Sequence, residues 1–584
     1  MSRHVWRVLA LAVAALTGLA IPACGGGGGR DEGGAIGTGA PVKGKKGGTL
    51  KALYANDLEH IDPGEAFYQP DYMMVFAVHR PLYSFEPTNL EVASPDLAAA
   101  PPKLSDGGRT VTVKLKPGVR YGPPVNRTAT SADVKYAIER AFTAAVPNGY
   151  APTYFGIVEG APEPGQKKAT DIKGIETPDE ETIVFRLSES SGAFVKALSL
   201  PITAPVPEDY AKRYDAETPS RYATHQAATG PYMIEAGKDG RITYEIGKRM
   251  TLVRNPNWSA ATDFRPAYVD RIELTMGNED TTVAARQILK GKGLINGDFP
   301  PDPPVIKDAV QRRKSQITFA PLGNRYIGLN TKVKPLDDVN VRKAIIAASD
   351  RNALRLTRGG PIAGDLATHF LAPGQPGFEE AGGTKGPNLD FIQNPDGSMA
   401  LAADYMKKAG YASGRYTGSE TLTMVGDDSG VGARTAEVFQ SQLQKLGFKV
   451  DFRQVPHDTM FSKFCNVPEA RVAVCPNVGW LPDFADGQAW FDPTFSGESI
   501  VPENNSNWAQ LDVPAINEAI DEAKKITGQA ERDEAWGKID RMVMAQAPAV
   551  PWIWDNQANI ASSDVQGAIA RWNGQWDLSF TSIK

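Results

Sequence analysis

The chain has 584 residues, with 63 basic and 68 acidic side chains and a formal net charge of −5. At about 150 residues per domain, this length predicts roughly four domain-sized units or a few larger lobes. Hydrophobic residues make up 41% and charged residues 22%, ordinary values for a globular protein that exclude wholesale disorder. Because the chain is slightly acidic, we expect no nucleic-acid partner.

The first 23 residues have the pattern of an export signal. Arg3 and Arg7 precede an apolar run at 8–21, which is shorter than the roughly 20 residues of a membrane-spanning helix. The segment at 21–24, Ile-Pro-Ala-Cys, resembles a bacterial lipobox. That resemblance implies cleavage after residue 23 and lipidation of Cys24, which would anchor the protein to the outer face of the cell membrane. The alternative is an ordinary cleaved signal with an incidental cysteine.

Residues 24–48 form a glycine-rich segment, with 12 glycines at positions 25–48. It offers almost nothing to bury, so it predicts a flexible tether with a typical end-to-end distance of about 25–30 Å. A tether of that reach would hold a globular body clear of a membrane surface.

From Thr49 onward, short strands alternate with amphipathic helices. Residues 110–116 and 182–187 alternate apolar and polar side chains, which predicts half-buried strands. Thr130 and Asp133 have the spacing of a capping box, which predicts a helix beginning near Ser131. Further helices are predicted over 341–348, 400–409, 435–446, 515–526 and 531–545. Strands and helices mixed in this way predict an α/β body.

After Cys24 only two cysteines remain, Cys465 and Cys475. Outside the cytoplasm two nearby cysteines tend to pair, so we expect a disulfide between them; two buried thiols are the alternative. Without a CxxC partner, this pair argues against a zinc site. We expect no metal site and no cofactor.

Several segments resemble, in the same order, the extracytoplasmic solute-binding proteins of family 5, the dipeptide- and oligopeptide-binding class. They are 110–142, TGPYMIE at 229–235, LVRNPNW at 252–258, 326–351, KKAGY at 407–411, LQKLGFKVDF at 443–452 and GWLPDFAD at 479–486. Each match is short, but together the matches extend over nearly the whole mature chain. The resemblance therefore rests on their combined extent and common order.

The resemblance implies an α/β, two-lobed periplasmic-binding-protein-like fold of type II. Lobe I would comprise residues 49–322 and 556–584, with an extra subdomain at about 91–224, and lobe II residues 323–555. The two chain crossings, near 323–326 and 554–556, would form a hinge. A ligand that contacts both lobes only when they close would stabilise the closed state.

The resemblance also implies the substrate-binding component of an ABC importer rather than an enzyme. Such a protein captures oligopeptides between its lobes and delivers them to permease subunits in the membrane, where a cytoplasmic ATPase powers import. This chain has no GxxxxGK[ST] phosphate loop, so the ATPase would be a separate protein. We expect a monomer that meets the membrane only through its lipid anchor.

Within GWLPDFAD, the resemblance assigns Asp483 to the α-ammonium group of the ligand. A buried ammonium needs a carboxylate, because its desolvation is otherwise too costly. The alternative for Asp483 is a helix N-cap or turn residue. Gly479 and Trp480 would contact the ligand through backbone pairing and indole packing. Tyr68 and Tyr72, in the family's first loop at the cleft, are further candidates.

One loop departs from the family pattern. Dipeptide-specific members carry an arginine, after the strand that corresponds to 421–425, which holds the ligand's carboxylate. Here the loop reads Gly-Asp-Asp-Ser at 426–429. Two acids repel a carboxylate at short range, which favours a longer peptide or a basic one.

Three alternatives stay open. The same fold could bind a non-peptide solute such as an oligosaccharide, an opine or a metal complex, and Asp483 would then matter far less. A sensor or chaperone-like lipoprotein would have the same sequence features. A glycosidase would need two carboxylates at a suitable separation, for which Asp483 and Asp486 are candidates, but the common enzyme motifs are missing.

Overall fold

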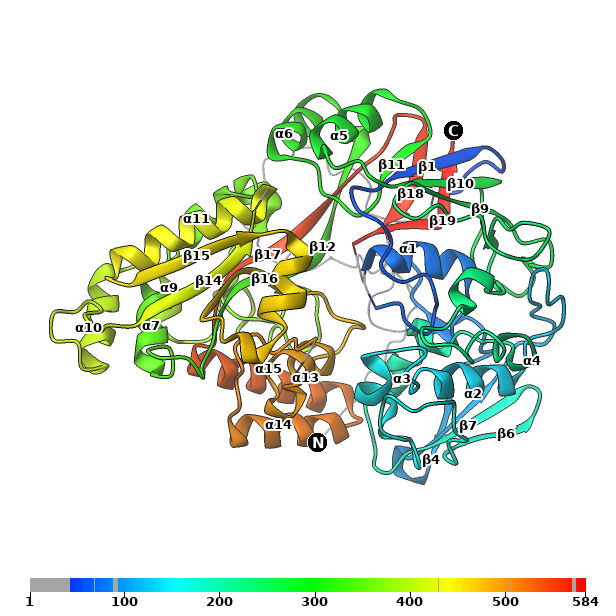
Figure 1. The fold of residues 1–584 in the computed structure, drawn as a ribbon, viewed down its shortest axis with the longest axis horizontal. Coiled ribbons are helices and arrows are strands. Elements are labelled where there is room, and N and C mark those ends of the chain that lie inside the picture. Colours follow the sequence, from blue (N-terminus) through cyan, green and yellow to red (C-terminus); the bar gives the residue numbers. More distant parts are fainter. Residues whose placement is uncertain (1–41, 68, 88–92, 429, 503, 570–573) are drawn as a thin grey trace, which may run out of the picture.

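Two lobes lie at opposite ends of the long axis of the computed structural model (Figure 1). The structure describes residues 42–67, 69–87, 93–428, 430–502, 504–569 and 574–584. The predicted export signal, Cys24 and the first part of the predicted tether lie outside these ranges. Among the described residues, no helix combines the length and the apolar character that crossing a bilayer requires.

Lobe I is built on a mixed sheet in the order β11-β1-β10-β9-β8. β1 pairs in parallel with both β10 and β11, and its residues Leu50 and Ala52 are fully buried. The strands of this sheet are β1 (Thr49–Leu53), β8 (Tyr232–Ile234), β9 (Arg249–Arg254), β10 (Arg271–Thr275) and β11 (Leu294–Asn296).

Helices and a C-terminal hairpin complete lobe I. They are α1 (Gln69–Val78), α5 (Thr281–Lys290), α6 (Pro303–Arg312), β18 (Val565–Ile569) and β19 (Trp576–Ile583). The apolar faces of α5 and α6 form a separate cluster with Ile317 and Ile560. The C-terminal residues therefore return to the lobe that contains the first strand, as Figure 1 shows.

A subdomain within lobe I carries the antiparallel sheet β4-β5-β7-β6. The predicted capping box is confirmed: Thr130 and Asp133 bond each other's backbone amides at the start of α2. The elements of this region are β2 (Tyr83–Ser84), β3 (Ser94–Pro95), β4 (Lys103–Ser105), β5 (Thr110–Lys114), β6 (Ile175–Asp179), β7 (Thr182–Arg186), α2 (Ser131–Arg140), α3 (Phe194–Ala197) and α4 (Glu208–Ala211).

Lobe II is built on the sheet β13-β17-β12-β16-β14-β15. Its strands are β12 (Ile317–Leu329), β13 (Gly364–Asp365), β14 (Thr421–Asp427), β15 (Lys449–Val455), β16 (Val474–Trp480) and β17 (Ala549–Ile560). Its helices are α7 (Val339–Ala348), α8 (Arg351–Leu356), α9 (Asp390–Gln393), α10 (Met399–Lys408), α11 (Gly430–Lys445), α12 (His457–Met460), α13 (Gln488–Phe495), α14 (Pro514–Lys525) and α15 (Gln529–Gln546).

Two features of lobe II bear on the predictions from sequence. Cys465 and Cys475 are joined in a disulfide. Helix α11 begins at Gly430, before the predicted start at residue 435, because its glycine-rich first turn packs against the end of β14. A Cβ on Gly432 would lie 1.7 Å from a carboxylate oxygen of Asp427, so any side chain at this position would displace that carboxylate.

The two long strands β12 and β17 pair with each other from Ile317–Ile560 to Gly328–Ala549. Figure 1 shows them running side by side from lobe II into lobe I. The register shifts between Pro321 and Gly323 and again between Arg325 and Tyr326. The chain crossings predicted near 323–326 and 554–556 fall within these strands. The domain boundaries themselves stay a prediction.

Candidate ligand-binding site

Asp483 lies in the connection between β16 and α13, and its side chain is directed toward lobe I. Only 3% of the residue is exposed. The hydroxyl of Tyr154 donates to one carboxylate oxygen at 2.6 Å, and the hydroxyl of Tyr150 donates to the other. Both tyrosines belong to lobe I, at the helical turn Ala151–Phe155. Helix α13 is capped by Gly487, so Asp483 is not its N-cap.

No cation neutralises this carboxylate within the part of the chain that the structure describes. Burial raises the pKa of Asp483 to about 6, although the hydrogen bonds from Tyr150 and Tyr154 act to lower it. A buried carboxylate without a cationic partner would be stabilised by binding a positively charged group, because burial has removed the water that would otherwise stabilise its charge.

The raised pKa predicts how Asp483 affects stability. Its ordinary value is 3.8, so between about pH 4 and pH 6 the unfolded chain loses a proton that the folded chain keeps. The free energy of unfolding therefore falls as the pH rises through this window. We expect the stability of the wild type, measured relative to Asp483→Asn by urea denaturation, to fall from pH 4 to pH 6 and then level off. Parallel curves would contradict the assigned environment.

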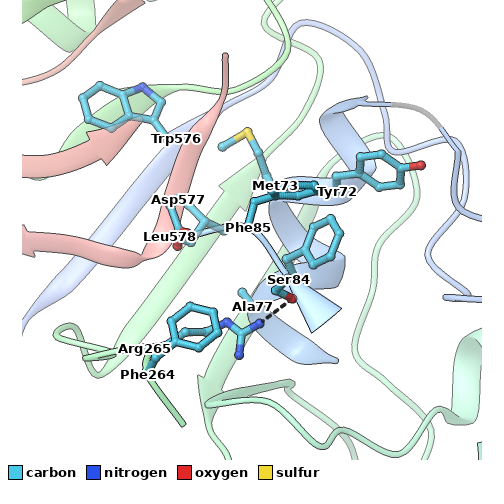
Figure 2. A pocket seen from close by; sticks show the side chains of 11 residues that line it. Tyr72, Met73, Ala77, Ser84, Phe85, Phe264, Arg265, Trp576, Asp577 and Leu578 are labelled. Carbon is cyan, nitrogen blue, oxygen red and sulfur yellow. Dashed lines mark hydrogen bonds between the residues drawn. The ribbon is translucent and has the colours of Figure 1, made fainter. Parts of the chain in front are cut away.

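Aromatic rings surround the Asp483 carboxylate. The ring of Tyr154 contacts Phe484 with centroids 4.9 Å apart, and Tyr150 lies 5.6 Å from Tyr154. Tyr72, from α1, is fully buried, and burial together with the Asp483 charge raises its pKa. Figure 2 shows a small hollow in lobe I, which Tyr72 lines together with Met73, Phe264 and Trp576 among others.

Asp486 and Asp492, near Asp483 in sequence, have cationic partners instead. Arg532 donates to both carboxylate oxygens of Asp486 at 2.7 Å, and Lys196 of lobe I lies 3.2 Å away. Burial opposes ionisation of Asp486, but these cations outweigh it and lower the pKa. Asp492 lies 3.3 Å from Lys524. Asp483 is therefore the member of this group whose charge is uncompensated.

Gly479 and Trp480 end strand β16 just before Asp483. A Cβ on Gly479 would lie 2.2 Å from the carbonyl oxygen of Asn324, so the close approach of β12 requires glycine. Trp480 is half-buried; its indole N–H donates to the carbonyl of Ala489 at 2.6 Å, and its ring packs edge-on against Trp508. Their contact with a ligand stays a prediction.

The acidic segment at 426–428 begins in a strand rather than a loop, because β14 continues to Asp427 and pairs there with Val455 of β15. Asp427 accepts hydrogen bonds from Nδ1 of His457 at 2.7 Å and from Asn477 at 2.9 Å, and only 5% of it is exposed. Asp428 is exposed. Asp427 thus has a structural role at the start of α11.

The structure brings Tyr72, Asp483 and the β16 pair Gly479 and Trp480 to the junction of the lobes, whereas Tyr68 lies outside the described residues. Sequence reasoning missed Tyr150 and Tyr154. Their spacing of four residues, which places both on one face of a helical turn, was the available signal.

A second set of contacts joins the lobes at the end of α14. Ser190 donates to the carbonyl of Lys525 at 3.1 Å, and the amide of Gly192 donates to the carbonyl of Lys524, also at 3.1 Å. A Cβ on Gly192 would lie 2.1 Å from the carbonyl oxygen of Ile526. The two lobes therefore meet at the end of α14 as well as at Asp483.

Comparison with known proteins assigns the family. Residues 93–501 match the bacterial extracellular solute-binding proteins, family 5 Middle. The chain is 24% identical over 459 residues to di/tripeptide-binding protein 3 of Pseudomonas aeruginosa (77% of this chain, 79% of that protein). It is 22% identical over 459 residues to heme-binding protein A of Haemophilus influenzae (77% and 79%).

Among solved structures, the fold is similar to that of clavulanic acid biosynthesis oligopeptide binding protein 2. The TM-score is 0.80 at 27% identity, and the match covers 94% of this chain and 98% of the other. Both this fold and the sequence match span most of the chain. The protein therefore belongs to family 5 of the bacterial extracellular solute-binding proteins, with their two-lobed α/β fold.

Proposed function

We propose that this protein captures oligopeptides between its two lobes and delivers them to the permease of an ABC importer. The observation that carries the proposal is the buried carboxylate of Asp483, which has no cationic partner and lies where the lobes meet. The α-ammonium group of a peptide would supply the missing charge. Relatives named for di- and tripeptide binding and for oligopeptide binding support this ligand class.

Capture couples to closure through groups from both lobes. Asp483 comes from lobe II, and Tyr150 and Tyr154 from lobe I, so the complete anchor exists only when the lobes are together. A ligand that binds this anchor stabilises the closed state by its differential affinity for closed over open. The closed form is the state that a permease would recognise.

The predicted export signal extends the proposal to location. Cleavage after residue 23 and lipidation of Cys24 would place the protein on the outer face of the cell membrane, and the predicted tether would let it reach the permease.

Mass spectrometry of the protein purified from its own cells tests both parts. Molecules released by unfolding should include peptides with free amino termini, and the intact mass should include a lipid on Cys24. Purified peptides should also raise the melting temperature, because ligand at 100 times its Kd adds about 2.7 kcal/mol of stability. Release of a non-peptide solute alone would overturn the peptide assignment.

A non-peptide solute is the second candidate, and the similarity to a protein named for heme binding favours it. The two candidates differ in how they use Asp483. A peptide requires its carboxylate, whereas an uncharged solute such as a sugar would bind nearly as well to Asp483→Asn.

If binding requires the lobes to close, a change that disturbs their contact at α14, such as Gly192→Ala, should lower the affinity for the ligand. The added methyl group would collide with the carbonyl of Ile526. The collision would break the hydrogen bonds that Gly192 and Ser190 donate to carbonyls at the end of α14. At 0.5–1.5 kcal/mol for each bond, we expect ligand affinity to fall by about 1–3 kcal/mol in calorimetry. Ser188→Ala, on the same loop but bonded to Ile157 within lobe I, is the control and should bind normally. Equal affinities for the two variants would contradict a role for this contact in closure.

A further inference from the structure

Basic side chains gather on α5 and α6 of lobe I. The segments 286–292 and 307–314 carry seven basic residues and one acidic residue, Asp308, although the whole chain has a net charge of −5. Among the basic residues, Arg313 is half-buried. The other six are exposed and form what we call the basic patch: Arg286, Lys290, Lys292, Lys307, Arg312 and Lys314.

The two helices lie side by side and run in the same direction, which brings these charges together (Figure 1). Thr281, the first residue of α5, donates to Asp302, which precedes α6, at 3.2 Å. At the opposite ends, Arg313, just after α6, donates to the carbonyl of Leu289 on α5 at 3.0 Å. The acids Asp280 and Asp302 lie at the N-terminal ends of the helices, away from four patch residues at the C-terminal ends: Lys290, Lys292, Arg312 and Lys314.

Few of these positive charges are compensated. Asp308 lies 3.2 Å from Arg312, and among the described residues no acid pairs with the other five side chains of the basic patch. Asp564 also lies at this end of the helices, where it accepts from the amide of Gly293 at 3.0 Å, and the C-terminal Lys584 lies beside it. With these acids and the terminal carboxylate included, the positive charges still outnumber the negative ones.

The stability of the helices does not explain the whole basic patch. A cation in the last turn of a helix interacts favourably with the helix dipole, which accounts for Lys290 and Arg312, the last residues of α5 and α6. It does not account for Arg286 and Lys307, which lie near the middle of the two helices. Arg286 and Lys290 are moreover four residues apart on one face, where like charges repel. An anionic surface would relieve this repulsion.

The predicted tether joins lobe I beside the basic patch. Thr49, the residue after the tether, begins β1, and a Cβ on Gly293 would lie 2.9 Å from its carbonyl oxygen. Gly293 directly follows Lys292 of the patch. The part of the tether that the structure describes, residues 42–48, contains three further exposed lysines. The predicted lipid anchor is therefore attached to the region of lobe I that carries the patch.

We propose that the basic patch docks lobe I on the anionic phospholipid surface of the membrane that holds the lipid anchor. The inference rests on the proposed location and adds to it an orientation of the protein. Each Lys or Arg close to an anionic membrane raises the affinity about fivefold, the equivalent of about 1 kcal/mol. The rest of the chain has a net negative charge and would be repelled, so one face is favoured. Lobe II stays free to open and close.

Sedimentation with lipid vesicles tests this inference without the lipid anchor. The chain is expressed from residue 25, which keeps the folded body, because all the buried residues that the structure describes lie at position 50 or later. It should bind vesicles of phosphatidylglycerol and phosphatidylcholine in equal parts, and not vesicles of phosphatidylcholine alone. Raising the salt from about 0.1 M to 1 M shortens the Debye length from about 10 Å to about 3 Å and should release the protein.

The triple variant Lys290→Gln, Lys292→Gln and Lys314→Gln should bind the anionic vesicles about a hundredfold more weakly, at about fivefold for each charge removed. These side chains are exposed, so the free energy of unfolding, measured in urea, should stay close to that of the wild type.

The matched control is Lys103→Gln, Lys167→Gln and Lys168→Gln, which removes the same charge from exposed positions of the subdomain and should leave binding unchanged. A wild type that does not bind anionic vesicles, or an equal loss in both triple variants, would overturn the inference. Binding to native membranes but not to vesicles of their extracted lipids would identify a protein as the partner, and would overturn it too. The peptide assignment and the lipid on Cys24 are tested separately, by the mass spectrometry described above.

Discussion

Replacing Asp483 by Asn is expected to weaken peptide binding by about 3–5 kcal/mol, the cost of leaving a buried ammonium without its counter-charge. The asparagine side chain keeps the size of aspartate and can still accept from Tyr150 or Tyr154, so the loss would report charge rather than shape. Calorimetry at pH 7.5, where the carboxylate is ionised, measures the difference. N-acetylated peptides, which lack the ammonium, should bind the two proteins almost equally.

An unchanged affinity for unmodified peptides would remove Asp483 as the amine anchor. The same variant should not lose stability without ligand, because it removes a buried charge that has no partner. A variant that bound less only because it had unfolded would show a lower free energy of unfolding, so urea denaturation separates the two causes.

Replacing Asp486 by Asn is expected to lower the free energy of unfolding by about 3–5 kcal/mol. This variant should therefore lose stability, whereas Asp483→Asn should lose peptide affinity and keep its stability. Asp486 is fully buried against Arg532, whose side chain is 1% exposed, and the change would leave that cation unpaired. Urea denaturation measures the loss.

Asp483→Asn is the natural control for this experiment, since it lies three residues away and is buried in the same region. A loss below about 1 kcal/mol for Asp486→Asn would show that Arg532 finds another partner or water. The pair of variants thus tests whether an aspartate paired with a cation stabilises the fold, whereas an aspartate without one binds the ligand.

The sequence predicted those helices and strands that are specified by residues close together in the chain. The alternating residues at 110–114 and the capping box at Thr130 specify β5 and α2 through contacts only a few residues apart. Sequence propensity predicts too late a start for α11, because glycine is a poor helix former, whereas in the structure Gly432 leaves room for the Asp427 carboxylate beside the first turn.

The candidate site was only partly predictable, for a physical reason. Asp483 could be named because it lies in a motif with Trp480. Tyr150 and Tyr154 are more than 300 residues away in the chain, at separations of 333 and 329 residues, and no local pattern links them to Asp483.

The pairing of β12 with β17 has a consequence for how the protein can move. Since the two connections are hydrogen-bonded neighbours, bending one requires bending the other, and sliding or independent swivelling of the halves would break the ladder between them. We therefore expect opening to proceed by bending of the two strands together, and one inter-dye distance across the molecule, followed on single molecules, would report it.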